Sequence, residues 1–347
     1  MNKKELDKLQ QLIGSDLNGY IITRYINSGS FGDVFEGKHK KTGELVALKI
    51  PIKNDERDGL DSLLEEAKVY KIISDRENGV AQMKVIKNNN RKIIVMDLLG
   101  PSLEELINQH KKFSLKTVIS LAISMISVIK HIHNKGFIHR DIKPDNFTLG
   151  YTDPTKLFCI DFGLARKYIK RNGEHIPFTD DKKFCGTARY ASIASHIGHE
   201  QSRKDDLESI GYLLVYLYKE KLPWQGIKHK DKNKKYELIG EKKQKISVEE
   251  LCSDMPKEFT IFLISEPVKP LDNLEIISKS IVFSLYKSFK YILNNCFLSS
   301  NVGSVICSIL STLPALINAV SIYFSFILIA NITTIPASVL IESNSAK

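Results

Sequence analysis

Residues 139–146 read HRDIKPDN, and Asp161 opens a DFG triplet further along the chain. Within the first stretch Asp141 supplies a carboxylate, Lys143 a cation and Asn146 an amide oxygen. Phosphoryl transfer needs a base for the attacking hydroxyl, a positive charge beside the moving phosphoryl group, and oxygen ligands for magnesium. A lone DFG triplet is common by chance, but the eight-residue run with this triplet downstream is specific. The two stretches therefore predict a phosphoryl-transfer site.

A glycine-containing segment upstream predicts how the phosphates of a nucleotide are covered. Residues 27–34 read NSGSFGDV between two strand-like stretches, and a third such stretch carries Lys49. Gly29 and Gly32 let backbone N–H groups approach phosphates, and Lys49 can reach them as a point charge. The two glycines alone would suit an ordinary hairpin turn. With Lys49 downstream they favour a nucleotide-binding loop.

The next segment predicts a helix that supports this lysine. Apolar residues recur at helical spacing over residues 60–70, and the same segment carries Glu65 and Glu66. One of these two glutamates is expected to form an ion pair with Lys49. Glutamates on helices usually face water, so the helical pattern alone does not assign a role to either.

A hinge and a helical second half are predicted after that helix. The apolar strand 93–96 is broken by residues 97–101, DLLGP, whose backbone groups can receive an adenine ring. Ser102 and Glu105 have the spacing of a capping box, which predicts the start of a helix. Residues 115–134 then predict a long amphipathic helix.

The composition limits the class of protein. The 347 residues suit one large two-lobed domain or two ordinary domains. Lys and Arg number 50 against 40 Asp and Glu, which gives a net charge of +10. Lysines cluster over residues 228–243, where they suit either an acidic partner or a solvated face. These clusters show no repeated interleaving with aromatic residues and no recognisable nucleic-acid fold, so no nucleic-acid binding is expected.

The cysteines and the first residues indicate a reducing compartment. No CxxC pair and no His/Cys spacing typical of a zinc site occurs in the sequence, so neither a disulfide framework nor a zinc site is predicted. Residues 1–11 are charged and lack an apolar core, so no signal peptide is predicted. The five cysteines are Cys159, Cys185, Cys252, Cys296 and Cys307.

Five further motifs carry a family resemblance. They are LGPSLE at 99–104, KFSLKT at 112–117, GTARYASI at 186–193, EQSRKDDLES at 200–209 and LPWQG at 222–226. With the stretches above, they make the chain resemble a eukaryotic protein kinase, and within that group the casein kinase 1 family. The resemblance covers about residues 20–263.

This resemblance implies an α+β fold with two lobes. A small β-rich N-lobe is expected over about residues 20–98, and a larger helical C-lobe from about residue 100. Residues 1–19 would form an N-terminal arm, and residues 264–347 a divergent, apolar C-terminal segment.

The resemblance also assigns roles to individual residues. Asp141 would be the catalytic base and Lys143 the charge-stabilising lysine, while Asn146 completes the catalytic set and, with Asp161, holds Mg²⁺. Asp206 would brace the catalytic loop from a central helix. The residues expected at the ATP site are Asn27, Gly29, Gly32, Val34, Lys49, Glu66, Met96, Leu99 and Asp161.

Members of this family use ATP and Mg²⁺ to phosphorylate Ser or Thr at sites preceded by phosphate or acidic residues. The resemblance therefore implies acidic or phosphorylated protein substrates, and we expect Arg189, Lys242 and Lys243 to form an anion pocket for them. It further implies activity without activation-loop phosphorylation, a monomeric state, and a location in the cytoplasm, the nucleus or both.

Three positions depart from the family pattern. Asn27 stands at the first loop glycine, Ala194 at a family asparagine and Cys185 at a usual threonine. Asn tolerates positive φ better than most residues, so we expect weaker nucleotide binding at Asn27 rather than lost catalysis. The alternative function is a catalytically impaired pseudokinase or scaffold, which the segment 264–347 would tether to a membrane if it inserts.

That C-terminal segment admits three interpretations. Residues 291–341 contain no charged residue, and residues 302–330 are almost wholly apolar. An uncharged run of this length can be a membrane-spanning tail. It can also be a buried replacement for the helices that close the large lobe, or the product of a slipped reading frame. Membrane contact, if it occurs, would run through residues 302–330.

Overall fold

A computed structural model describes residues 9–29, 32–50, 58–88 and 91–265. All of them belong to Met1–Leu285, the first of two units into which the chain divides. The expectations for residues 266–347, including the membrane contact through 302–330, lie outside the described residues.

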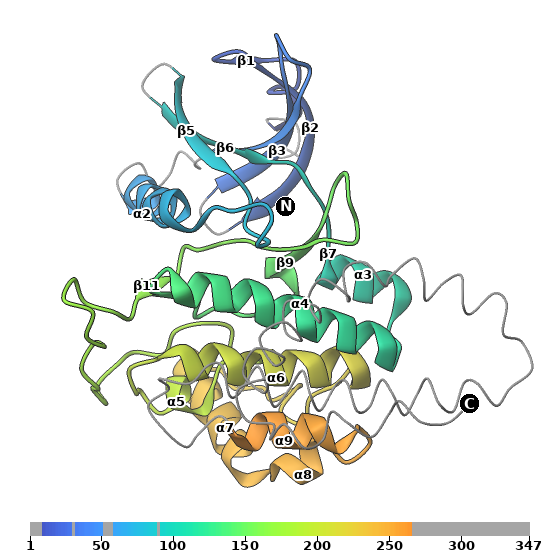
Figure 1. The fold of residues 1–347 in the computed structure, drawn as a ribbon, viewed down its shortest axis with the longest axis vertical. Helices are drawn as coiled ribbons and strands as arrows, with labels where there is room; N and C mark the ends of the chain where they lie inside the picture. The colour runs from blue at the N-terminus through green and yellow to red at the C-terminus, as the bar shows by residue number, and fades with distance from the viewer. Residues whose placement is uncertain (1–8, 30–31, 51–57, 89–90, 266–347) are drawn as a thin grey trace, which may run out of the picture. The chain divides into compact units, whose positions relative to one another are not determined.

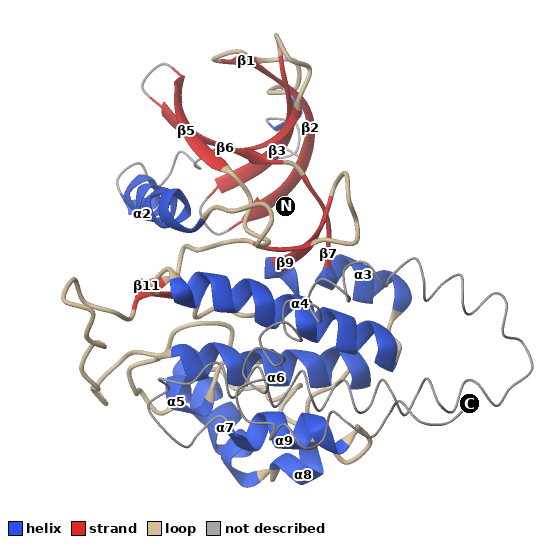
Figure 2. Cartoon of the chain, viewed as in Figure 1, coloured by secondary structure: helices blue, strands red, loops and turns tan. Residues whose placement is uncertain are grey.

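The N-lobe is built on one antiparallel sheet in the order β1-β2-β3-β4-β6-β5 (Figure 1). Helix α2 of this lobe lies beside β5 (Figure 2). The elements are β1 (Asp16–Leu17), β2 (Tyr20–Gly29), β3 (Gly32–His39), β4 (Leu45–Ile50), α2 (Asp58–Ile73), β5 (Met83–Asn88) and β6 (Arg91–Asp97). The predicted β-rich N-lobe is confirmed.

The first strand corrects the predicted start of this lobe. We expected an arm over residues 1–19, but β1 pairs Asp16 with Ile21 and Leu17 with Tyr20. Leu17 is buried in the small-lobe core together with Tyr20. The sheet therefore begins inside the segment predicted as an arm.

The C-lobe is helical, and α4 and α6 pack against each other at its centre (Figure 1). Small sheets β10-β9-β7 and β11-β8 accompany the helices. The elements are β7 (Leu99–Ser102), α3 (Leu103–His110), α4 (Leu115–Asn134), β8 (Phe137–Ile138), a 3-10 helix (Pro144–Asn146), β9 (Phe147–Gly150), β10 (Leu157–Cys159), β11 (Arg166–Lys167), α5 (Ile193–His196), α6 (Arg203–Lys219), α7 (Lys232–Lys245), α8 (Val248–Leu251) and α9 (Lys257–Ser265).

Helices α3 and α4 begin where the sequence predicts. The Ser102 hydroxyl accepts from the Glu105 N–H at 3.1 Å, and the Glu105 carboxylate accepts from the Ser102 N–H at 2.8 Å. This confirms the predicted capping box of α3. The bounds of α4 confirm the helix predicted over residues 115–134.

Helix α4 has an unusually apolar composition. It is long and apolar enough to cross a membrane by length and composition. Its buried residues, among them Val118, Met125 and Ile129, belong to the large-lobe core shared with α6. Since a core helix meets the same criteria, the composition of α4 is accounted for by packing.

Candidate active site

The catalytic loop lies between β8 and β9 and is held from below by α6. The Asp206 carboxylate, only 1% exposed, accepts hydrogen bonds at 2.8 Å from the N–H of His139 and the N–H of Arg140. It also contacts the Nε2 atom of His133 at 2.8 Å. Arg140 has a φ of 67°, an uncommon value for a residue with a side chain. Asp206 thus fixes the strained start of the loop, as the sequence predicts.

Asp141 is buried within reach of three polar side chains. Its Oδ2 atom lies 2.7 Å from the Lys143 ammonium, and its Oδ1 accepts from the Thr187 hydroxyl at 2.7 Å. The Asn146 amide nitrogen donates to the Asp141 carbonyl at 2.8 Å. The structure therefore brings together the three residues predicted as the catalytic set. Thr187 was not predicted, although it lies in the quoted motif 186–193.

The contacts of Asp141 and Lys143 with each other determine the protonation of both groups. Burial by itself would raise the pKa of Asp141, but the hydrogen bond and charge of Lys143 outweigh it, and the net pKa is lowered. For Lys143, burial lowers the pKa, but Asp141 overcomes this effect and the net pKa is raised. Both groups are therefore charged at neutral pH, and Asp141 is ready to accept a proton.

The lysine of β4 is held by α2. The Lys49 ammonium lies 2.7 Å from the Glu66 carboxylate, with side-chain exposures of 12% and 4%. Burial raises the pKa of Glu66, and the charge of Lys49 acts against that rise. The predicted pairing of Lys49 is confirmed, and the partner is Glu66. Glu65 pairs instead with Lys68 on the exposed side of the helix.

The DFG triplet links α2 to the catalytic loop. Phe162 is buried, with its ring centroid 4.9 Å from that of Tyr70 and 5.1 Å from that of His139. Asp161 has a φ of 63°, and its carboxylate accepts from the Gly163 N–H at 3.3 Å. The buried Phe162 ring anchors this strained turn and fixes the position of the Asp161 carboxylate.

The glycine segment forms the hairpin between β2 and β3. Asn27 pairs with Val34 and Gly29 with Gly32, while Val34 also pairs with Lys49 in β4. The Asn27 side chain accepts from the N–H of the next residue at 2.8 Å. The hairpin thus joins the segment predicted to cover the phosphates to the strand that carries Lys49.

The hinge carries an ion pair that the sequence analysis missed. Arg76 donates from Nε at 2.8 Å and from Nη2 at 2.5 Å to the two carboxylate oxygens of Asp97, the last residue of β6. Met96 and Leu99, predicted at the adenine site, flank this position and are both partly buried. Arg76 follows α2 in a polar turn, where nothing in the local sequence distinguishes it from a solvated arginine.

The donor set of the site fits magnesium. Mg²⁺ is usually held by one or two protein oxygens together with substrate phosphates, rather than by a cage of protein ligands. The amide nitrogen of Asn146 is committed to Asp141, so its amide oxygen is the atom it can offer, beside the Asp161 carboxylate. Within the described residues no group of three His, Cys, Asp or Glu side chains forms a metal site. A two-ligand site for nucleotide-bound Mg²⁺ agrees with both observations.

A comparison with protein families decides which fold this site belongs to. The family described as "Protein kinase domain" matches residues 20–312. The chain belongs to the protein kinase family. The match includes residues 264–312, although we expected the resemblance to end near residue 263.

The kinase departs from prediction at the proposed anion pocket. Lys243 is 3% exposed, and its ammonium donates to the carbonyl of Ala191. Its role as a substrate-facing cation is wrong, because the side chain points into the protein beneath the loop. Lys242 is exposed, as expected. Arg189 is half-buried, with its guanidinium 5.4 Å from the ring centroid of Tyr216.

His196 lies next to the buried lysine and introduces a pH dependence. Its Nε2 atom is 3.2 Å from the Ala188 carbonyl, and its ring packs 4.9 Å from that of Phe184. Burial, followed by the charge of Lys243, lowers the pKa of His196 to about 4. The kinase therefore holds His196 uncharged at neutral pH.

We expect this histidine to destabilise the kinase in acid. Between pH 6.5 and about 4 the unfolded chain binds a proton at His196 that the folded chain does not, so stability falls as pH falls through this window. The loss should be about 2 kcal/mol after allowance for partial exposure. Urea unfolding at pH 7 and pH 4.5 measures it, and His196→Gln should remove this part of the difference. His229→Gln, at an exposed site, is the matched control. Equal pH dependence in both variants would contradict the assignment.

Proposed function

We propose that this protein is a Ser/Thr protein kinase of casein kinase 1 type that transfers the γ-phosphoryl group of ATP to acidic or phosphate-primed protein substrates. The observation that carries the catalytic part is the assembled set of Asp141, Lys143 and Thr187, with contacts of 2.7 Å. The buried Lys49–Glu66 pair supports it, since a kinase needs this pair in place to position the phosphates. The Ser/Thr and family assignment is supported by the sequence motifs at 186–193 and 200–209.

The residues on the nucleotide side of the site would balance the charge of the phosphates and fix their position. When bound with ATP, Mg²⁺ neutralises negative charge on the phosphates. Asn146 and Asp161 would hold the ion through their side-chain oxygens. Lys49, fixed by Glu66, would contact the phosphates from the N-lobe. These residues orient the γ-phosphoryl group towards the catalytic loop.

The residues of the catalytic loop act on the acceptor. The Oδ2 atom of Asp141 accepts from both Lys143 and Asn146, whereas Oδ1 accepts from the Thr187 hydroxyl, so Oδ1 keeps a lone pair that can accept a hydrogen bond from the substrate hydroxyl. The hydroxyl oxygen forms the new O–P bond, the bond from the γ-phosphorus to the bridging oxygen breaks, and ADP leaves. Asp141 receives the hydroxyl proton, and Lys143 offsets charge on the moving phosphoryl group.

The preference for acidic substrates is supported by the cations on the loop and on α7. Burial lowers the pKa of Arg189, but its hydrogen bond and charge interaction with Tyr190 help to outweigh this effect. The net pKa is raised, so the guanidinium stays charged. Glu104 lies near enough to oppose part of this charge. We propose that Arg189 and the exposed Lys242 each offer positive charge to a phosphate or carboxylate of the substrate. Lys243 is excluded from this surface by its burial.

Phosphate transfer to matched peptides tests this function. Three serine peptides differing only in a phosphoserine, an aspartate or an alanine before the acceptor are compared, with ³²P transfer as the readout. We expect kcat/KM to fall in that order, and the double variant Arg189→Ala with Lys242→Ala to reduce the ratio of primed to neutral peptide about tenfold.

The matched control is Lys116→Ala, an exposed lysine at the start of α4, which should leave the ratio unchanged. Equal ratios in the double variant and in the wild type would rule out these two residues as the anion site. A wild-type chain that phosphorylates none of the peptides would contradict the kinase proposal itself.

A further inference from the structure

The segment 185–191 is held by side chains that donate to its carbonyl groups. These donors come from α5, from α7 and from the connection after α6. The contacts join Ser195 Oγ to Cys185 O (2.8 Å), His196 Nε2 to Ala188 O (3.2 Å), Trp224 Nε1 to Arg189 O (2.7 Å) and the Lys243 ammonium to Ala191 O. The backbone of the segment is therefore fixed in orientation along its whole length.

Burying Lys243 costs more free energy than burying any of the other donors. A lysine with 3% exposure has lost most of its hydration, which is strongly unfavourable for a charged group. Its ammonium lies 4.7 Å from the ring centroid of Tyr212 and 5.0 Å from that of Trp224, so aromatic faces replace part of the lost water. Burial lowers the pKa of Lys243 to about 7, and the charge of Glu208 counteracts this.

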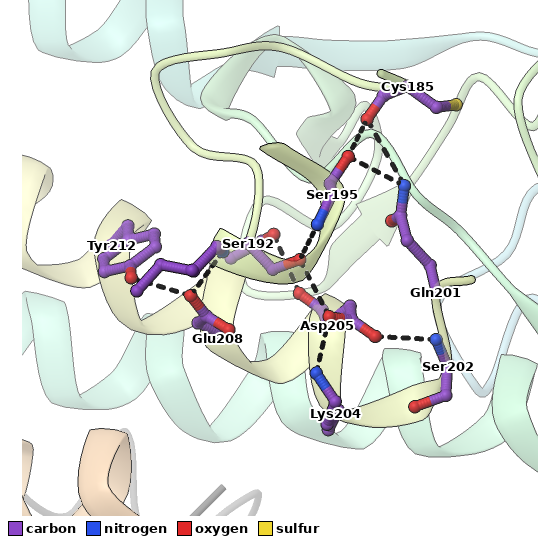
Figure 3. Close-up of polar contacts among 11 residues, drawn as sticks. Cys185, Ser192, Ser195, Gln201, Ser202, Lys204, Asp205, Glu208 and Tyr212 are labelled. Atoms are coloured by element: carbon purple, nitrogen blue, oxygen red, sulfur yellow. Dashed lines mark hydrogen bonds and ion pairs between the residues drawn. The ribbon is translucent and has the colours of Figure 1, made fainter. Parts of the chain in front are cut away.

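Glu208 of α6 accepts a hydrogen bond from the backbone just after this segment. Its carboxylate accepts from the N–H of Ile193 at 2.8 Å and from the Tyr212 hydroxyl at 2.7 Å. Figure 3 shows Tyr212 and the backbone next to Ser192 both contacting the Glu208 carboxylate. The neighbouring Ser192 hydroxyl donates to Asp205 at 2.8 Å. A buried lysine and a buried glutamate thus bind a carbonyl and an N–H that are two residues apart.

The carbonyl that Lys243 binds belongs to the turn that begins at Thr187. The N–H groups of Tyr190 and Ala191 both donate to the Thr187 carbonyl at 2.9 Å. The Thr187 hydroxyl in turn donates to Asp141 at 2.7 Å. One turn of backbone therefore connects the Lys243 ammonium to the carboxylate that would accept the substrate proton.

We propose that Lys243 is a positioning residue for phosphoryl transfer, because it fixes the turn 187–191 and through Thr187 the orientation of Asp141. This inference rests on the proposed kinase function for its effect on catalysis. It replaces the substrate-facing role expected from the sequence, since Lys243 acts on the backbone and not on the substrate. Small displacements of a catalytic group cost rate even when the displaced support lies outside the site.

A double-mutant cycle tests the connection. We expect Lys243→Met and Thr187→Val each to lower kcat about tenfold, with the KM for ATP unchanged. The double variant should also lie about tenfold below wild type, because both changes remove the same support. A double variant about 100-fold below wild type would show two independent effects and overturn the proposal. An unchanged kcat in Lys243→Met would overturn it as well.

Stability separates positioning from a general structural role. Lys243→Met leaves the Ala191 carbonyl without its donor and the buried Glu208 without the nearby cation, so its melting temperature is expected to fall, and kcat is therefore compared at a temperature where circular dichroism shows both proteins fully folded. Lys245→Met is the matched control, since Lys245 is on the same helix with a 75% exposed side chain. It should leave both kcat and the melting temperature unchanged. A kcat equal to that of the wild type, measured where the variant is fully folded, would overturn the proposal.

Amide hydrogen exchange gives a readout that does not need activity. In Lys243→Met the N–H groups of Tyr190 and Ala191 should exchange about tenfold faster, while the amides of α6 keep their rates. Unchanged exchange at Tyr190 and Ala191, or equal acceleration across α6, would overturn the proposal. If the wild type shows no transfer, the kinase function fails, and this measurement still decides whether Lys243 holds the turn.

Discussion

Replacing Asp141 by Asn is expected to lower kcat for peptide phosphorylation about 10³-fold, with little change in the KM for ATP. The carboxylate is the only group in the described site that contacts both the Lys143 ammonium and the Thr187 hydroxyl, each at 2.7 Å. An amide keeps the shape but cannot take the substrate proton. Measuring initial rates of ³²P transfer over a range of ATP and peptide concentrations separates the two constants.

The matched control for this experiment lies in the same loop. Asp145 is exposed, so Asp145→Asn should keep kcat within about twofold of wild type. A similar loss in both variants would show that the loop had been disturbed as a whole. Retention of full activity in Asp141→Asn would rule out Asp141 as the base. An inactive wild type that still binds ATP would instead favour the pseudokinase alternative.

The ion pair of the N-lobe was predictable because both partners lie in regular elements. Lys49 follows a strand pattern, and the helical pattern placed Glu65 and Glu66 within reach of it. The helix pattern alone could not choose between neighbours that point about 100° apart. Packing against the C-lobe decides: the Glu66 side chain is 4% exposed, whereas that of Glu65 is 70% exposed.

The position of Lys243 shows where reasoning from sequence fails. Two adjacent lysines on a strongly polar helix indicate a solvated face, and lysine is almost never fully buried. Only the fold places Tyr212 and Trp224 around one of them while the other stays exposed. Thr187 was missed for a related reason, because its contact with Asp141 joins residues 46 positions apart. Both errors concern long-range contacts that no local pattern encodes.

The buried contacts of Asp206 allow a simple measurement of its contribution to stability. Replacing Asp206 by Ala is expected to lower the free energy of unfolding by about 4 kcal/mol. The carboxylate accepts two backbone N–H groups and contacts His133, all at 2.8 Å and within the core. Alanine would leave these polar groups buried without an acceptor, and it would free the strained backbone at Arg140. Urea unfolding of the purified kinase at pH 7.5 measures the change.

The pKa of Asp206 supports the same expectation. Burial would raise this pKa, but the hydrogen bond from His133, the charges of His133 and His139, and the His139 N–H outweigh it, and the pKa is lowered. Because the pKa of Asp206 is lower in the folded state than in the unfolded state, its contribution to stability is fully present above the unfolded pKa. That contribution is lost as pH falls through the folded pKa, so the full effect of the substitution should be seen at neutral pH. Asp254→Ala is the matched control, since its side chain is 83% exposed and pairs with Lys219 at 3.5 Å. Its effect should stay below about 0.5 kcal/mol. A loss in Asp206→Ala no larger than in this control would mean that the catalytic loop keeps its conformation without the carboxylate.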